Sequence, residues 1–257
     1  MTIVEHNTLT NLGDNEYELP IGYIDGDGVL HKRFKLREMT GKVDEAIADK
    51  KIRSNAGKVV TELIYGVLEE LGTLPRIDRN IVRRLSNADR DYIVLMNFYQ
   101  SIAEEIEYTD MCAVCGSRLQ VEVNINNMPV SFMTDDEPRK ITITDLPNGF
   151  KDKEGNVFKE MTLTFPDGML QEKIFATVDK NPNQALTQVL AMCTESIKGF
   201  QSYNFESFSE LSKKDRKYIS TKLNEIKVGV ELAVDVECPE CGAETKSAIP
   251  FMTLLGE

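Results

Sequence analysis

The sequence predicts an α+β protein that is a tandem duplication of one unit with pseudo-twofold symmetry. Three blocks of residues recur in the same order at a shift of 126 or 127 positions, and this recurrence carries the prediction. Leu85–Ile93 returns as Leu211–Ile219, with six of nine residues identical. Two C-x-x-C-G turns, at 112–116 and 238–242, form another block. The remaining block consists of Leu19, Pro20, Gly22, Asp25, Gly28 and Lys32, each of which returns 127 residues later.

Each unit begins with a predicted β-hairpin and a helix. The turns at 26–28 and 154–156 separate strand-like runs and contain the glycine that tight turns favour. Apolar residues at helical spacing then predict one helix near 56–71 and its counterpart near 183–198. Gly72 and Gly199 are expected to close these helices in a left-handed conformation.

A second helix and a cysteine-bearing hairpin complete each unit. The spacings Ser86-x-x-Asp89 and Ser212-x-x-Asp215 predict helix starts, because the serine accepts from first-turn amides and the acid faces the positive helix end. Strands at 121–125 and 230–236 follow from alternating apolar residues. The helix that begins at Ser86 is expected to bury a series of apolar residues: Tyr92, Leu95, Met96, Tyr99, Ile102 and Ile106.

These elements divide the chain into four segments. We expect an N-terminal arm at 1–18, a first unit at 19–130, a linker at 131–144 and a second unit at 145–257.

The second unit ends in an apolar tail. Burying such side chains is worth about 1.5–3 kcal/mol each, either in the chain's own core or in a partner. Because the predicted elements of the second unit end before the tail, we expect the tail to bind a partner. The residues concerned are Phe251, Met252, Leu254 and Leu255.

The cysteine pairs predict one shared metal site. A C-x-x-C turn followed by glycine directs two thiolates at one point, and two such turns make a tetrahedral site that suits zinc. Each unit is therefore expected to be a hairpin, helices and a zinc knuckle, with one structural zinc held by Cys112, Cys115, Cys238 and Cys241. Iron in the same geometry, redox-active pairs and metal-free pairs are the alternatives. Redox-active pairs are disfavoured because a redox C-x-x-C usually begins a helix, whereas these lie between strands.

Cys193, His6 and His31 are expected to be structural. Cys193 lies in an apolar-periodic stretch, and free cysteine is among the most buried residue types. Neither histidine has a counterpart in the other unit.

Composition excludes several classes of protein. The net charge of −12 disfavours nucleic-acid binding, since phosphate contacts require a basic surface. The apolar runs are far shorter than the roughly 20 residues that cross a bilayer, so no membrane contact is expected. Phosphate-binding loops, metalloprotease motifs and nucleophile elbows are missing from the sequence, which predicts a protein that is not an enzyme.

The Leu-Pro-x-Gly-Tyr start, the Asp-Gly turn, the Leu-Ser-x-x-Asp-Arg-x-Tyr block and the C-x-x-C-G turn together are similar to a known family. The pattern resembles the baseplate hub assembly proteins of T-even-type bacteriophages, although the resemblance implies a single unit with one cysteine pair and this chain carries two. The resemblance implies a non-enzymatic baseplate protein, or a chaperone of hub assembly, that binds other tail proteins. It implies a location in the host cytoplasm during assembly, or in the virion tail.

A zinc-ribbon module of transcription or nucleic-acid processing is the alternative interpretation. Its cysteine pairs usually lie close in sequence, whereas Cys115 and Cys238 here lie 123 positions apart. The acidic composition also counts against it.

Overall fold

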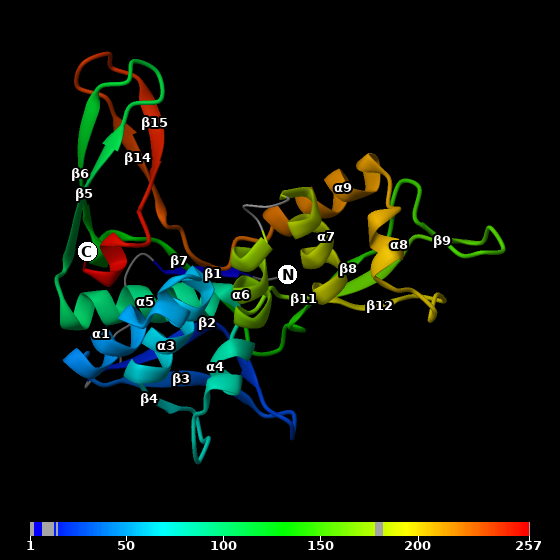
Figure 1. Ribbon diagram of the computed structural model, residues 1–257, viewed down its shortest axis with the longest axis horizontal. Helices are drawn as coiled ribbons and strands as arrows, with labels where there is room; N and C mark the ends of the chain where they lie inside the picture. Colours follow the sequence, from blue (N-terminus) through cyan, green and yellow to red (C-terminus); the bar gives the residue numbers. More distant parts are fainter. Residues whose placement is uncertain (1–2, 7–12, 14, 178–181, 257) are drawn as a thin grey trace.

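Helices and antiparallel strands are mixed throughout the computed structural model of the chain, which confirms the α+β class (Figure 1). The structure describes residues 3–6, 13, 15–177 and 182–256. The core consists of two hydrophobic clusters. The first draws mainly on residues 17–132 and the second on residues 141–219. Within the described residues, no helix combines the length and the apolar character needed to span a membrane.

A three-stranded antiparallel sheet packs in the first cluster, with strand order β2 (Glu16–Ile24), β3 (Leu30–Leu36) and β4 (Leu68–Leu71). The turn between β2 and β3 is the hairpin turn that the sequence predicted. Asp25 closes it, because Oδ1 of this residue accepts hydrogen bonds from two backbone N–H groups further along the turn, each at 2.9 Å. Aspartate stabilises turns in this way because its side chain is short enough to reach its own backbone.

Helices share the first hydrophobic cluster with this sheet. Three of them connect β3 to β4, and α3 contributes buried Val60, Leu63, Ile64 and Val67 to the first cluster. Their bounds, with those of the two helices that follow β4, are α1 (Gly41–Ala48), α2 (Lys50–Arg53), α3 (Ala56–Val67), α4 (Arg79–Arg84) and α5 (Asn87–Ser101).

The helix predicted over 56–71 is shorter than expected, because it ends at Val67 and the chain continues directly as β4. Leu68 and Leu71 are both buried, and their spacing of three fits a helix as well as this short strand. Hydrophobic periodicity therefore did not separate the two conformations. The pairing of β4 with β3 decides the outcome, and Gly72 (φ 53°) closes a strand instead of a helix.

A buried aspartate joins the start of α5 to β2. Ser86 caps the helix as predicted, accepting from the N–H of Asp89 at 3.1 Å. The carboxylate of Asp89 accepts from the N–H groups of Ile21 and Gly22, at 2.7 and 3.2 Å. Gly22 has φ 90°, and a Cβ there would lie 2.7 Å from the side chain of Lys32, so this bend requires glycine.

The second cluster has a similar sheet and its own helices. Its three-stranded antiparallel sheet has the order β8 (Lys140–Ile143), β11 (Met161–Thr164) and β12 (Thr194–Ile197). A short strand pair, β9 (Phe150–Lys151) and β10 (Val157–Phe158), lies in the connection between β8 and β11. The helices are α6 (Gly168–Thr177), α7 (Pro182–Cys193), α8 (Phe205–Ser209) and α9 (Lys213–Asn224). The helix predicted near 183–198 likewise ends at Cys193 and continues as β12, whose pairing with β11 prevails over the helical periodicity.

Asp215 makes in this part the contacts that Asp89 makes in the first. It accepts from the N–H groups of Asn148 and Gly149, at 2.8 and 3.2 Å, and Ser212 caps α9 as predicted. The two sets of contacts fall on recurring sequence positions.

A third sheet runs between the clusters, with strand order β1 (Ile3–His6), β7 (Val130–Met133) and β13 (Gly229–Val230). Strands β7 and β8 thus fall largely within the range predicted as a linker, and the polar run 135–138 lies between them. Half of the predicted arm, 1–18, lies outside the described residues, and β1 and the start of β2 belong to the described half.

Two hairpins project side by side from the body (Figure 1). They are β5 (Glu105–Met111) with β6 (Arg118–Asn124), and β14 (Ala233–Glu237) with β15 (Glu244–Ala248). We call them together the tower. Short 3₁₀ turns follow each hairpin, η1 (Ile125–Asn127) and η2 (Thr253–Leu255).

The C-terminal segment, 229–256, crosses back to the first cluster. β13 pairs with β7, and Cys238, Ile249 and Leu254 are buried in the first cluster. Sequence order alone placed this segment with the second unit.

Two further expectations differ from the structure. α5 ends at Ser101, so Ile102 is 45% exposed and Ile106, although buried, belongs to β5. The strand predicted over 230–236 is interrupted between β13 and β14.

Helix α6, from the second half of the chain, docks on α3, α4 and α5 of the first. Arg90 is fully buried at this contact and donates to the carbonyl oxygens of Val82 (2.9 Å) and Gly57 (3.2 Å). It also donates to Oγ1 of Thr61 (3.1 Å) and Oε1 of Gln171 on α6 (3.2 Å). Burial lowers the pKa of Arg90 to about 10, partly offset by the nearby carboxylate of Glu172, so the guanidinium stays charged at neutral pH.

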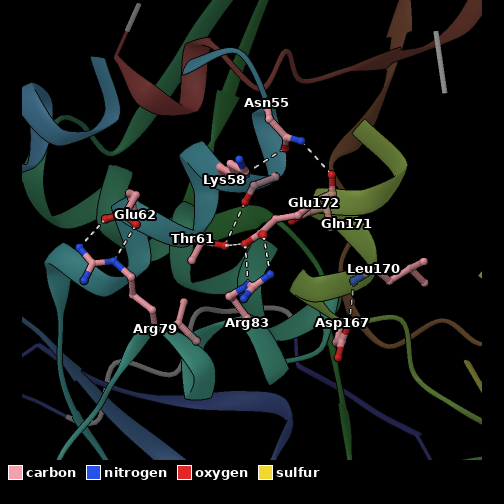
Figure 2. Close-up of polar contacts among 12 residues, drawn as sticks. Asn55, Lys58, Thr61, Glu62, Arg79, Arg83, Asp167, Leu170, Gln171 and Glu172 are labelled. Atoms are coloured by element: carbon pink, nitrogen blue, oxygen red, sulfur yellow. Dashed lines mark hydrogen bonds and ion pairs between the residues drawn. The ribbon is translucent and has the colours of Figure 1, made fainter. Parts of the chain in front are cut away.

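Figure 2 shows Glu172 of α6 between the side chains of Thr61 and Arg83. Its carboxylate accepts from Thr61 at 2.9 Å and from two nitrogens of Arg83 at 3.0 and 2.9 Å. The side chain of Asn55 donates to the backbone carbonyl of Glu172 at 2.8 Å. Gly57 permits the close approach, because a Cβ there would lie 2.7 Å from the backbone nitrogen of Glu172.

Replacing Arg90 by methionine should therefore destabilise the protein strongly. Four acceptors in a buried site would each lose one donor, and removing a partner from such a buried charged network typically costs about 3–5 kcal/mol. Arg33→Met is the matched control, since the Arg33 side chain is 73% exposed and should change stability by about 0.5 kcal/mol or less. Urea unfolding followed by circular dichroism measures both. Equal midpoints for the two variants would show that α6 docks without Arg90.

Candidate metal centre

The tower brings the four predicted cysteines together at its far end. In the first hairpin, Cys112 follows β5 directly, and its N–H donates to the carbonyl of Ser117 at 2.8 Å. The N–H of Gly116 donates back to the carbonyl of Cys112 at 2.9 Å. These two bonds fold the turn so that Cys112 and Cys115 lie on one side of it.

The second hairpin repeats this geometry. The N–H of Cys238 donates to the carbonyl of Ala243 at 2.9 Å, and the N–H of Gly242 donates to the carbonyl of Cys238 at 2.8 Å. Cys112 and Cys238 are buried, whereas Cys115 and Cys241 are exposed.

The closest sulfur pairs join one hairpin to the other. Sγ of Cys112 lies 3.8 Å from Sγ of Cys241, and Sγ of Cys115 lies 3.6 Å from Sγ of Cys238. All four sulfurs lie within 4.8 Å of one another. In a tetrahedral site with metal–sulfur bonds of about 2.3 Å, neighbouring sulfurs are about 3.8 Å apart. The cluster therefore has the donor set and the spacing for a single four-thiolate ion.

The hydroxyl of Ser117 distinguishes the two turns. It lies 3.1 Å from Sγ of Cys115 and 3.2 Å from Sγ of Cys238, whereas the second turn has Ala243 at the equivalent position. Hydrogen bonding from Ser117 lowers the pKa of Cys238 to about 6. The amide of Ala243 favours the thiolate of Cys241, but the neighbouring cysteine sulfurs outweigh it and raise the pKa to about 12. The neighbouring sulfurs thus oppose ionisation of Cys241, and a bound cation would remove that opposition.

A buried polar link holds the hairpins together below the cysteines. Tyr108 of β5 donates to Oγ of Ser247 on β15 at 3.0 Å, and Ser247 in turn donates to the carboxylate of Asp110. Tyr108 is 8% exposed and Ser247 is 1% exposed. The sequence did not predict this link, and its only signal there was a tyrosine at an inward-facing position of an alternating strand.

Other candidate ligands lie elsewhere. His31 is buried, with Nε2 3.0 Å from the carboxylate of Asp25 and Nδ1 accepting from the N–H of Thr73 at 3.3 Å. The side chain of His6 lies outside the described part of the structure. Cys193 is buried in the second cluster, and burial raises the pKa of its thiol to about 12, as fits a structural residue.

The apolar tail lies on the chain's own core. Leu254 is 1% exposed in the first cluster, and Phe251 and Leu255 pack against that cluster. Met252 is 47% exposed. Of the four tail residues predicted to bind a partner, Leu254 is buried, Phe251 and Leu255 are half-buried, and Met252 is exposed.

Leu254→Ala should consequently destabilise the protein by about 2–5 kcal/mol, the range for large-to-small changes in a packed core. Met252→Ala removes a side chain of similar size from the same turn and should change stability by about 0.5 kcal/mol or less. Thermal unfolding followed by calorimetry compares the two. A neutral Leu254→Ala variant would mean that the tail does not contribute to the core in solution.

Comparison with known proteins identifies the family. The model of the family described as T4 bacteriophage base plate protein matches residues 28–249, a range that includes both cysteine pairs and both halves of the fold. No curated protein and no solved structure matches the chain. Because the match covers most of the sequence, the chain belongs to the family of T4-type bacteriophage baseplate proteins.

Proposed function

We propose that this chain is a non-enzymatic protein of the contractile tail baseplate, or a factor that assembles the baseplate hub, and that it binds other tail proteins. Family membership is the observation that carries the proposal. Its place of action is the host cytoplasm during assembly, the finished tail, or both in turn. In the tail segment, Met252 is available for such contacts.

A single structural zinc is proposed to join the two hairpins of the tower. Two-stranded hairpins are marginally stable alone in water, so a tower built from two of them gains from a crosslink at its far end. Zinc suits four thiolates without redox chemistry, and iron in the same geometry is the less favoured ion. The cysteine spacing and the short cross-hairpin sulfur distances support a shared site.

Tandem duplication is proposed as the origin of the two similar halves. The matching contacts of Asp89 and Asp215 support it. The sheets agree as well: Phe34 pairs with Leu71 in the first, and Met161 pairs with Ile197 at the corresponding positions of the second. In both sheets the strand register shifts just beyond this pair, after the next residue of the central strand.

A zinc-ribbon role in nucleic-acid processing has less support. The tower carries many more acidic than basic residues, and this charge repels phosphate.

Elemental analysis should find one zinc per chain in protein purified under reducing conditions. Cys238→Ser should lower the zinc content and the thermal midpoint together, since metal binding and folding of such sites are coupled. Cys193→Ser, which also removes a buried thiol, should keep the full zinc content. Two zincs per chain, or none, would refute the shared site.

Affinity-tagged protein, isolated from cells that produce the phage, should bring down baseplate or hub proteins identifiable by mass spectrometry. A Leu254→Ala variant that unfolds at the working temperature is the negative control. Recovery of transcription or replication proteins in their place would favour the zinc-ribbon alternative.

A further inference from the structure

A groove separates two strands of the tower. Its volume is roughly 520 Å³, and consecutive residues of both strands line it: Gln120–Asn124 on β6 and Ala233–Val236 on β14. Side chains alternate between the faces of a strand. A lining of consecutive residues therefore means that strand edges, rather than sheet faces, border the groove.

Neither edge has a strand partner in the described part of the chain. β6 pairs with β5 and β14 pairs with β15, each in a two-stranded sheet. The outer edge of such a strand carries N–H and C=O groups that can template a further strand.

The charged side chains that line the groove are all acidic. Glu122, Glu231 and Asp235 line it, and no lysine or arginine does. Lys246 on β15 lies 2.7 Å from Glu231 and 4.0 Å from Asp235, whereas Glu122 forms no ion pair with another described residue. The hairpins of the tower contain only two basic residues, Arg118 and Lys246. Their acidic residues are more numerous: Glu105, Glu107, Asp110, Glu122, Asp235, Glu237, Glu240 and Glu244.

Two like-charged pairs lie directly across the hairpins. Glu107 faces Glu122 between β5 and β6, and Glu237 faces Glu244 between β14 and β15. None of these four carboxylates forms an ion pair with another described residue. Like charges directly opposite one another destabilise a hairpin. The free tower is thus less stable than it would be with a cation between such carboxylates.

We propose that the groove receives an extended segment of a partner protein that bears lysine or arginine at alternate positions and adds as a strand to the edge of β6. Its backbone would pair with β6, and its cations would lie on the face of β6 that carries Glu122, whose neighbour across the hairpin is Glu107. Backbone bonds give such strand addition its affinity, and alternate side chains give it specificity. This inference rests on the proposed role in binding other tail proteins, and it locates one binding surface.

A labelled eight-residue peptide of alternating lysine and valine serves as the probe, titrated into zinc-supplemented full-length protein by fluorescence anisotropy. We expect saturable binding that weakens at least tenfold in a Glu107→Gln/Glu122→Gln double variant. Glu154→Gln/Glu206→Gln is the matched control: it removes the same charge from exposed residues of the second half and should bind as the unchanged protein does. Equal weakening in both variants would overturn the assignment of the site.

A second peptide, of alternating lysine and proline, separates strand addition from simple charge attraction. It has the same charge but lacks half of the N–H donors, so it should bind at least tenfold more weakly. Hydrogen exchange should show β6 amides protected by the valine peptide only. Equal affinities for the two peptides, or unprotected β6 amides, would overturn the proposal. If tagged protein carrying the Glu107→Gln/Glu122→Gln change still captures baseplate proteins, the groove is rejected while the proposed function stands.

Discussion

The meeting of four sulfurs at the end of the tower is the constraint on which the chain path depends. Cys112 and Cys115 come from the first half, and Cys238 and Cys241 come from the end of the chain. For these to lie within 4.8 Å, the C-terminal segment must leave the second cluster and return along the first. The pairing of β13 with β7, the Tyr108–Ser247 link and the burial of Leu254 all lie along this return path.

Helix α5 organises the rest of the molecule through two adjacent buried residues. Asp89 holds the bend of β2, and Arg90 holds the carbonyl groups of α3 and α4 together with α6. The two point to different neighbours because successive residues on a helix lie about 100° apart, as 3.6 residues per turn require. One helix turn thereby connects the first sheet, the first set of helices and the second half of the chain.

Local features of the fold were predictable because short-range chemistry determines them. Turn closure by Asp25, capping by Ser86 and Ser212, and the two cysteine turns each involve residues within five positions of one another. The four metal-site candidates were also recognisable, since recurrence linked the two pairs. The change from helix to strand at Leu68 was not predictable, because both conformations bury the same leucines and only pairing with β3 decides between them. Docking of α6 at Gly57, and the return of the tail to the first cluster, depend on contacts between residues more than 100 positions apart.

The return of the C-terminal segment also orders events during synthesis. The second half of the fold is an insertion between the two parts of the chain that form the first cluster. Ribosomes release the chain from its N-terminus onward, so the surface that Leu254 covers stays uncovered until that residue has emerged, after the whole second cluster. The inserted half has all of its own sheet and helices before residue 225 and can fold while translation continues. The first half of the chain is therefore synthesised first, but its hydrophobic cluster is completed after that of the second half.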